Sequence, residues 1–477
     1  MLIDPPLKTI ADYTLYKKIN SELAYSTARY CLMDALGCAM LALKYPDCTR
    51  LLGPLVPNTI VDCGVSVPGT EFKLDPVQGA FNIGTLIRWL DFNDTWLAAE
   101  WAHPSDNLGA LLAVAEYVSL QKIREKQPPL LMHDVLTAMI KAYEIQGILA
   151  LNHSFNRLGF DHVILVKIAS AAVAMQLFGG NLEAIIAVLS LSLIDGPALR
   201  TYRQAPNTGT RKSWAAADAT SRAVRLALLV KLGEMGYNQA LSAHTYGFND
   251  VILRGEPLVI AQELSSYCIE NILFKISYPA EFHAQTAVEC AITLHQQIKN
   301  RLDDIEKILL TTQESAMRII NKKGSLTNFA DRDHCLQYMV ATALLYGDLT
   351  ADYYHSPMAD DPRLDFLRDK MQVEEDISFS ADYLDKNKRS IANSIQIYFK
   401  DGSCSEKITL HYPLGHQKRR AESIPLLLEK FKNNVTHFFP PAKIDSLLNL
   451  FMDQETLHQM PVPQFMQLWQ LLHDKKV

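Results

Sequence analysis

The sequence lacks the segments that direct a protein into or across a membrane. Its N-terminus, MLIDPPLKTIADYTL, has no basic stretch followed by an apolar core, so it does not predict a secretory signal peptide. The longest apolar run, Ala184–Ile194, lies between two acidic residues and is too short to cross a bilayer, so it predicts a buried core helix. Both absences favour a cytoplasmic protein that does not bind membranes.

Closely spaced cysteine ligands are also absent. None of the eight cysteines forms a CxxC pair, and no compact group of cysteine and histidine suggests a zinc or iron–sulfur site. Cysteines far apart in the sequence could still converge in space. The pattern favours buried free thiols in a reducing compartment, at Cys31, Cys38, Cys48, Cys63, Cys268, Cys290, Cys335 and Cys404.

An excess of positive charge is missing as well. Lysine and arginine number 46 against 52 acidic residues, for a net charge of −6 and an isoelectric point near 6.2. This balance argues against a general affinity for nucleic acid or anionic membranes, which needs a basic surface. Dinucleotide-binding, kinase and GxSxG motifs are absent too. What remains is an ordinary globular composition in a chain of 477 residues, long enough for two domains.

Hydropathy patterning divides the chain into three stretches. From about residue 20 to 247, apolar residues recur at three- and four-residue intervals, which predicts helices, several of them buried on all sides. Between about 270 and 410, Ile305–Glu314 has strand character, and two alternating apolar runs around Asp401-Gly402 predict a hairpin. Helical periodicity returns from about Ile424, and these last helices could pack on the first stretch. We therefore expect a mainly α fold, with a large helical domain and a smaller α+β domain.

The segment Trp89–Asn107 gathers acidic residues and one histidine among aromatic residues. Pro104 suits the first position of a helix, which places His103 at the N-cap. Positive charge is unfavourable at a helix N-terminus, so His103 should stay neutral and able to accept a proton. The alternative is that His103 only caps the helix and the acidic residues are solvated, and composition does not choose between the two.

The segment Leu199–Leu229 is strongly basic and contains only one acidic residue, Asp218. Its stretch PNTGTRKS predicts a loop that enters a helix, where backbone N–H groups beside Lys212 would bind a carboxylate or phosphate. The helix end should also lower the pKa of Lys212, which suits proton transfer. An exposed basic face with an Asp218–Arg222 pair is the alternative, but exposed charges usually alternate in sign, so we favour an anion site. The basic residues are Arg200, Arg203, Arg211, Lys212, Arg222 and Arg225.

The remaining polar segments carry weaker signals. Lys275 and His283 lie just before an amphipathic helix, where a lone histidine is more often structural than catalytic. The same applies to His162, His334 and His416. By themselves, these residues indicate an enzyme or a binding protein for a small polyanion.

Several of these segments together resemble the MmgE/PrpD family, and the resemblance covers nearly the whole chain. The matching segments are DFNDTWLAAEWAHPSDN, RTYRQAPNTGTRKSWAAADATSRAVRLAL, ENILFKISYPAEFHAQTAVE, NFADRDHCLQYMVA and YPLGHQKRR. The resemblance implies a helical domain at 1–270, completed by about 415–477, with an α+β lid domain at 271–414. It also implies a homodimer that uses no metal and no other cofactor. The first two segments are closest to the branch of the family that dehydrates methylcitrate.

The resemblance also implies positions for the active site. The family's active-site residues fall on Asp91, Thr95, His103, Lys212, Lys275 and His283. Tyr338 is a further candidate for substrate binding. Relatives commonly have Gly-aromatic-His where this chain reads Gly159-Phe160-Asp161-His162, which leaves the role of His162 open.

The implied reaction removes water from 2-methylcitrate to give 2-methyl-cis-aconitate, in propionate breakdown. We expect His103 to act as the base with Asp91 orienting it or tuning its pKa, while Lys212 and Lys275 stabilise negative charge. His283 or Lys212 would protonate the leaving hydroxyl. By our own inference, Arg200, Arg203 and Arg211 are candidates for binding the other carboxylates.

Two alternatives use the same anion site. One is a cis-aconitate decarboxylase-like enzyme, in which carbon dioxide leaves. The other is a protein that binds a tricarboxylate without transforming it. Formation of itaconate from cis-aconitate would identify the decarboxylase. Binding of methylcitrate without its consumption would identify the binding protein.

Overall fold

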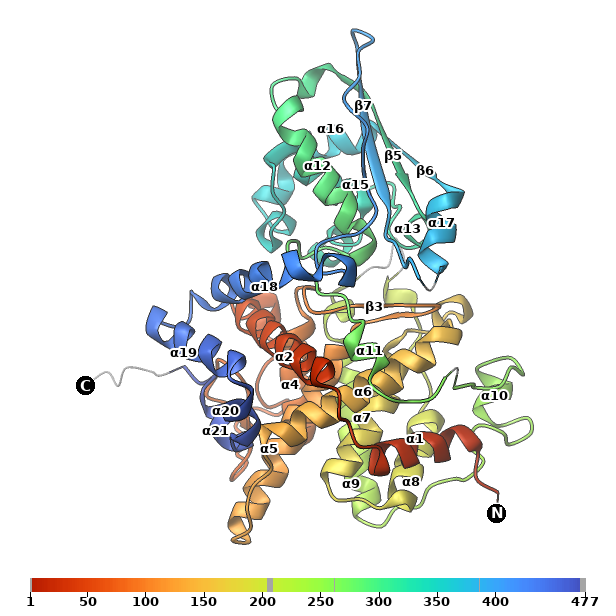
Figure 1. The fold of residues 1–477 in the computed structure, drawn as a ribbon, viewed down its shortest axis with the longest axis vertical. Coiled ribbons are helices and arrows are strands. Elements are labelled where there is room, and N and C mark those ends of the chain that lie inside the picture. Colours follow the sequence, from red (N-terminus) through yellow and green to blue (C-terminus); the bar gives the residue numbers. More distant parts are fainter. Residues whose placement is uncertain (1, 204–208, 261, 386, 472–477) are drawn as a thin grey trace.

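The computed structural model describes residues 2–203, 209–260, 262–385 and 387–471. The chain folds into a larger helical part and a smaller part built around a four-stranded sheet (Figure 1). This confirms the expected mainly α fold with a smaller α+β part. The helical part contains α1 (Pro5–Tyr16), α2 (Glu22–Ala42), α3 (Pro46–Thr49), α4 (Pro76–Arg88), α5 (Leu108–Arg124), α6 (Met132–Asn152), α7 (Val163–Leu177), α8 (Leu182–Ile194), α9 (Ala215–Lys231), α10 (Phe248–Val251) and α11 (Tyr267–Glu270).

Helix α4 leads directly into the segment rich in acidic and aromatic residues. It begins at Asp75, whose carboxylate accepts hydrogen bonds from the N–H groups of Val77 and Gln78, and Pro76 occupies its first turn. It ends with Arg88, where the helix C-terminus favours positive charge. Helix α4 packs against α5 and α9, so Arg88, at its C-terminal end, lies in the interior of the bundle.

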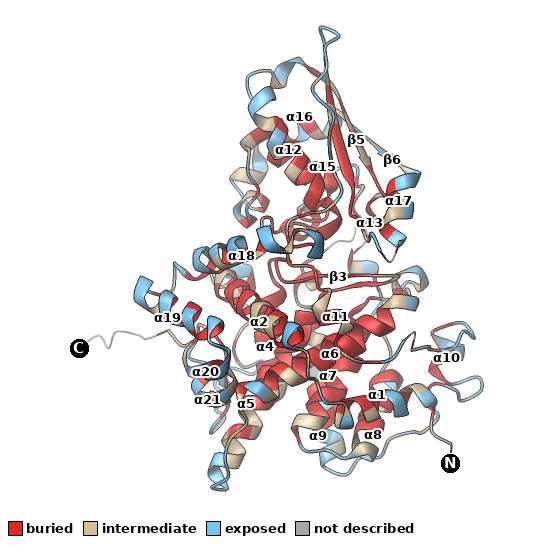
Figure 2. Ribbon diagram, viewed as in Figure 1, coloured by how far each residue is buried: buried red, intermediate tan, exposed pale blue. Residues whose placement is uncertain are grey.

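The bundle core lies along α4, α6 and α7, and Figure 2 shows buried residues concentrated there. Helix α7 is buried at every position from Val163 to Met175, which confirms the expectation of helices buried on all sides. Helix α8, expected as a buried core helix, is buried on one face and leaves Ile194 exposed. No helix among the described residues combines the length and the apolar character needed to span a membrane.

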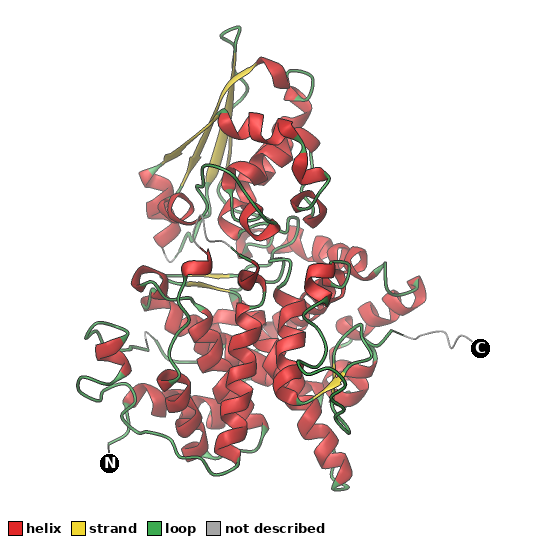
Figure 3. Ribbon diagram, turned by 180° about the vertical axis from the view of Figure 1, so that it is seen from behind, coloured by secondary structure: helices red, strands yellow, loops and turns green. Residues whose placement is uncertain are grey.

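Two short strand pairs accompany the bundle. Strands β1 (Val65–Ser66) and β2 (Lys73–Leu74) pair antiparallel, as do β3 (Trp96–Leu97) and β4 (Trp101–Ala102). The β3–β4 pair lies where the helical part faces the smaller part, as the view from behind also shows (Figure 3).

The sheet of the smaller part has the order β6-β5-β7-β8. Strand β5 is parallel to β6 and antiparallel to β7, and β7 is antiparallel to β8. The expected strand near residue 305 and the hairpin around Asp401-Gly402 are both present. The elements are α12 (Gln285–Ile298), β5 (Ile305–Thr312), α13 (Glu314–Ile319), α14 (Phe329–Arg332), α15 (Leu336–Tyr346), α16 (Pro362–Asp369), β6 (Met371–Glu375), α17 (Ile377–Leu384), β7 (Asn393–Phe399) and β8 (Ile408–Leu410).

After the sheet, the chain returns to the helical part. Helix α18 packs against α2, α20 against α6, and α21 against α5. Phe431 of α18 lies over Gly37 of α2 and contacts the rings of Phe451 and Trp469. The last helices are α18 (Arg420–Val435), α19 (Pro441–Met452), α20 (Gln454–Gln459) and α21 (Val462–Gln467).

Candidate active site

Asp91 is the centre of a buried group of charged side chains between the two parts of the chain. It follows the end of α4 with φ = +49°, a left-handed conformation that aspartate tolerates better than most residues but that still costs on the order of 1 kcal/mol. The turn aims its carboxylate at three cations. Arg88 Nη1 lies 2.8 Å and Lys275 Nζ 2.6 Å from Oδ1, and Lys212 Nζ lies 3.5 Å from Oδ2.

These cations determine the ionisation of Asp91. Burial alone would raise the pKa of its carboxyl group, but Arg88, Lys275 and Lys212 outweigh burial and hold the pKa well below its usual range. Asp91 is therefore a carboxylate at all physiological pH values. Lys275 also donates a hydrogen bond to the backbone carbonyl of Asp91, at 2.5 Å, which ties the two segments together.

His103 lies beside Asp91 and is neutral. Its Nδ1 is 2.8 Å from the carbonyl oxygen of Asp94, and since a carbonyl only accepts, Nδ1 carries the proton. The unprotonated Nε2 lies 3.8 Å from Asp91 Oδ1, and Thr95 Oγ1 is 3.4 Å from Nδ1. Burial and then the charge of Arg88 lower the pKa of His103 well below its usual range. The 3-10 helix η1 (Pro104–Asn107) follows His103 as expected, but burial, rather than the helix end, is the largest cause of the shift.

Lys212 is one of the three buried cations around Asp91, and it joins the helical part to the smaller part. It lies in the 3-10 helix η4 (Thr210–Ser213), and its Nζ is 2.5 Å from Asp333 Oδ2. Burial lowers the pKa of Lys212, and Asp333 and Asp91 only partly oppose that effect. The expected direction is confirmed, although burial causes it. Residues 206–208 of the predicted loop lie outside the described residues.

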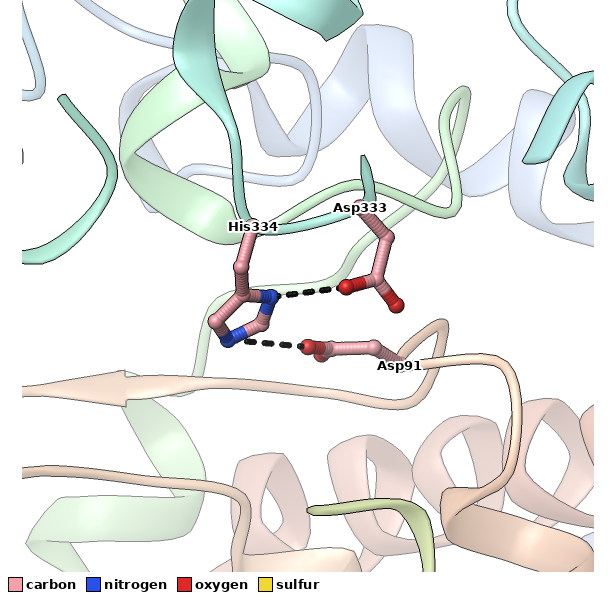
Figure 4. A group of neighbouring side chains, drawn as sticks. All are labelled: Asp91, Asp333 and His334. Carbon is pink, nitrogen blue, oxygen red and sulfur yellow. Dashed lines mark hydrogen bonds and ion pairs between the residues drawn. The ribbon is translucent and has the colours of Figure 1, made fainter. Parts of the chain in front are cut away.

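Asp333 and His334 also belong to this centre, and sequence reasoning did not select them. His334 Nδ1 lies 2.9 Å from Asp333 Oδ1, and its Nε2 lies 3.8 Å from Asp91 Oδ2 (Figure 4). Burial, with help from Lys212, lowers the pKa of His334 to about 4, so this imidazole is neutral too. Both residues lie in NFADRDHCLQYMVA, one of the segments that resemble the family, and this resemblance could have identified them. From that segment we chose only Tyr338 as a site residue.

Asp91, Asp333 and His334 have the donor types that bind a divalent metal, and their ligand atoms lie within 4.8 Å of one another. The ammonium of Lys212, however, already lies 2.5 Å from one carboxylate and 3.5 Å from the other. Arg88 and Lys275 add two more positive charges around Asp91. A metal ion would have to displace or repel these cations, so the donor set fits a metal poorly.

His283 occupies a neighbouring position with its own carboxylate. Its Nδ1 lies 2.9 Å from Glu281 Oε1, and its Nε2 lies 3.1 Å from the hydroxyl of Tyr383. Burial tends to raise the pKa of Glu281, but His283 holds it at about 2. The ring of Trp101 packs edge-on against His283, with centroids 5.7 Å apart.

The predicted arginines separate into two groups. Arg203 donates to Asp161, and Arg200 lies 3.7 Å from the same buried carboxylate and over the ring of Trp101. Arg211 instead bonds to Asp218 at 2.9 Å and stacks on Trp214, away from Asp91. The Asp218–Arg222 pair is also present, at 3.4 Å. The basic segment therefore contributes partly to the buried centre and partly to a paired surface.

His162 faces this centre as well. Its ring centroid lies 6.1 Å from that of His103, and burial lowers its pKa to about 3. Both ring nitrogens are buried without a hydrogen-bond partner among the residues that the structure describes. Tyr338, in contrast, has a hydrogen-bond partner within the smaller part. Its hydroxyl donates to the carbonyl of Tyr353 at 2.6 Å.

Two small cavities are each lined in part by the side chain of Tyr383. One of about 160 Å³ is bordered by Trp101, Arg318 and Tyr383, and one of about 180 Å³ by Leu97, Tyr383 and Arg389. Both cavities are bordered by Tyr383, whose hydroxyl lies 3.1 Å from His283 Nε2.

The arrangement suits proton abstraction next to a carboxylate. Neutral His103 can accept a proton, and Lys212, Lys275 and Arg88 can stabilise negative charge that develops nearby. The low dielectric of the buried site strengthens both effects.

Comparison with known proteins covers both parts of the chain. Residues 8–261 match the MmgE/PrpD N-terminal domain, and residues 278–454 match the MmgE/PrpD C-terminal domain. The chain is 55% identical over 469 residues to the 2-methylcitrate dehydratase of Escherichia coli (strain K12), covering 98% of this chain and 97% of that protein. It is 54% identical to the 2-methylcitrate dehydratase of Cupriavidus necator over the same shares. It is 49% identical to the probable 2-methylcitrate dehydratase of Saccharomyces cerevisiae, over 98% of this chain and 92% of that protein.

Proposed function

This chain belongs to the MmgE/PrpD family, and on that premise we infer that it is a hydro-lyase that converts 2-methylcitrate to 2-methyl-cis-aconitate. Identity of 54–55% over nearly the full length to 2-methylcitrate dehydratases supports this substrate. The structural observation that carries the proposal is a neutral His103 beside a carboxylate that three buried cations surround. The reaction belongs to the methylcitrate route of propionate breakdown.

In the proposed reaction, a C–H bond breaks at the methyl-bearing carbon and its proton moves to His103 Nε2. The electron pair of that bond forms the new C=C bond as the C–O bond of the adjacent carbon breaks. The leaving hydroxide takes a proton and becomes water. The carbonyl of Asp94 orients His103, and the negative charge of Asp91 stabilises the imidazolium that forms when Nε2 takes the proton. A proton donor of the site, His283 or Lys212, protonates the hydroxyl.

The carboxylates of the substrate need cations that are not already fully neutralised. Lys212 and Lys275 both contact Asp91, the carboxylate beside His103, so they can stabilise charge near the carbon that loses its proton. Arg200 and Arg203 are candidates for a second carboxylate, with Thr95 as a hydrogen-bonding partner. Arg88 is a better candidate than Arg211, because Arg88 is one of three buried cations that share Asp91, whereas Arg211 is half-buried and has Asp218 as its own partner.

The test is to incubate EDTA-treated protein with 2-methylcitrate and follow the ultraviolet absorbance of the conjugated double bond. Turnover without added metal is the expected result. Consumption of cis-aconitate with formation of itaconate, and no reaction with 2-methylcitrate, would indicate a decarboxylase instead. Binding of 2-methylcitrate without turnover would indicate a tricarboxylate-binding protein.

We also propose that residues 271–414 form a lid on a helical domain made of 1–270 and about 415–477.

We propose further that the protein works in the cytoplasm as a homodimer. Apolar side chains are exposed at the end of α9 and just after it, and they support a subunit interface at this surface: Leu229, Leu232, Met235 and Tyr237. Light scattering after size-exclusion chromatography would give the mass of a dimer.

A further inference from the structure

Lys430 lies on α18, far along the chain from the catalytic candidates, yet its ammonium is buried beneath them. Its Nζ lies 2.6 Å from Asp34 Oδ1 of α2. It also donates to the carbonyl of Phe92 at 2.7 Å and to the carbonyl of Lys275 at 2.6 Å. The two carbonyls take two of the three N–H donors of the ammonium, and the carboxylate of Asp34 lies at ion-pair distance from it.

The two carbonyls belong to the segments that form the charged centre. Phe92 directly follows Asp91, and Lys275 is one of the three cations that contact Asp91. Lys275 reaches back to the carbonyl of Asp91 at 2.5 Å and to its Oδ1 at 2.6 Å. Lys430, Phe92, Asp91 and Lys275 therefore form a closed ring of contacts, and Lys430 is the part of that ring which lies outside the site.

Stability alone accounts poorly for this arrangement. Removing a lysine and an aspartate from water has a large free-energy cost, which their mutual attraction only partly offsets. Burial raises the pKa of Asp34 to about 6, even with Lys430 beside it. Two apolar residues would fill the same space between α2 and α18 without this penalty. What they could not do is hold two backbone carbonyls at a fixed separation.

We propose that Lys430 is a positioning residue for the proposed dehydration: it holds the Asp91–Phe92 turn and the backbone of Lys275 in register. The inference rests on the proposed function. Lys430 does not touch the reacting atoms, so its removal should lower kcat rather than substrate affinity. Misplacement of catalytic groups by about 1 Å costs on the order of 100-fold in rate.

The experiment compares three variants with the wild type. Lys430→Met removes the ammonium and leaves Asp34 buried without a cation. Lys430→Met/Asp34→Asn removes both charges, so it should regain thermal stability but still lack a donor for the two carbonyls. Phe431→Leu is the matched control, because this neighbour on α18 packs against Gly37 and Trp469 instead of the charged centre. If Lys430→Met does not fold, the double variant, which leaves neither charge unpaired, carries the test.

We expect kcat to fall about 10- to 100-fold in both Lys430 variants, with KM changed less than about threefold. Phe431→Leu should lower the melting temperature and keep kcat within about twofold. A double variant with the kcat and KM of the wild type would overturn the proposal and leave a purely structural ion pair.

Failure of the proposed function would be visible in the wild type, as an absence of turnover with 2-methylcitrate. In that case the positioning role is tested by a crystal structure of the double variant. The distance between Lys275 Nζ and Asp91 Oδ1, 2.6 Å in the wild type, should lengthen. An unchanged distance would overturn the positioning role.

Discussion

His103 shows how the surroundings of one residue decide its chemistry. An exposed imidazole is half protonated near pH 6.5, but burial and Arg88 keep His103 neutral well below that pH. The hydrogen bond from Nδ1 to the carbonyl of Asp94 leaves Nε2 free as the basic atom. Its environment therefore fixes both its charge and the nitrogen that can accept a proton.

Substitution His103→Asn should lower kcat about 100- to 10,000-fold, because general-base catalysis contributes that much. Asparagine keeps a donor for the Asp94 carbonyl but has no basic nitrogen. Initial rates with 2-methylcitrate measure the loss, and a melting curve checks that the variant is folded. Near-full turnover in a folded variant would rule out His103 as the base.

The pH dependence of kcat follows from the lowered pKa of His103. The base is active when neutral, so lowering the pH from about 8 to about 6 should not reduce kcat through His103. A lowered pKa also means that His103 stabilises the fold above its unfolded pKa, and that this contribution is lost as the pH falls through the folded pKa. A pH–rate profile checks the first expectation, and an acid limb centred on pH 6.5 that is absent from His103→Asn would contradict it.

The sequence predicted those site residues that lie in recognisable sequence segments. His103 and Lys212 were chosen from their positions at predicted helix starts, Asp91 and Lys275 through the family resemblance, and the structure brings the four together. Arg88 was missed because a basic residue in the last turn of a helix is ordinary. Lys430 was missed because LLLEKFKNNV has the pattern of a surface helix. Both are buried only because segments far apart in the sequence cover them.

At the scale of elements, Gly415 allows the segment after β8 to lie against the strand-like segment that carries Lys275. Its φ is +93°, and an added Cβ would lie 1.8 Å from the carbonyl oxygen of Phe274. The N–H of Phe274 donates to the carbonyl of Gly415 at 3.2 Å. This close approach brings the beginning of α18 next to the active-site segment.

Substitution Gly415→Ala should therefore destabilise the protein by about 3 kcal/mol or more and lower turnover as well. Gly402→Ala is the control: Gly402 has a similar φ of +82° in the β7–β8 turn, but open space surrounds its Cβ position. It should cost about 1 kcal/mol, from the backbone conformation alone. Denaturant unfolding measures both, and equal losses would show that the contact with Phe274 is unimportant.

Element prediction succeeded where a local pattern carries the information. Alternating apolar residues gave β5 and the β7–β8 hairpin, and three- and four-residue spacing gave the long helices. Local patterns do not say which elements are neighbours. The packing of α18 on α2 depends on contacts between residues such as Gly37 and Phe431, nearly the whole chain apart.

At the scale of the whole molecule, the charged centre forms where the two parts of the chain meet. Lys212 comes from the helical part, and Asp333 and His334 come from the part that contains the four-stranded sheet. The ion pair between Lys212 and Asp333 therefore links the two parts as well as belonging to the site.

Substitution Asp333→Asn should destabilise the protein by about 3 kcal/mol, because Lys212 would remain buried with one carboxylate fewer. The control is Asp365→Asn, whose aspartate is exposed and pairs with Arg368, and which should change stability by less than about 1 kcal/mol. Calorimetry distinguishes the two, and separate melting of the two parts in Asp333→Asn would show that this pair couples them. Equal melting temperatures for both variants would contradict a linking role.

The position of Lys430 near the end of the chain has a consequence for biosynthesis. A nascent chain grows from its N-terminus, and domains usually fold in that order. Here, Asp34 lacks its cation and the face of α2 stays uncovered until α18 has left the ribosome. Helix α2 must therefore wait for α18, so a chain terminated before α18 should be degraded as an unfolded protein instead of persisting as a partly active enzyme.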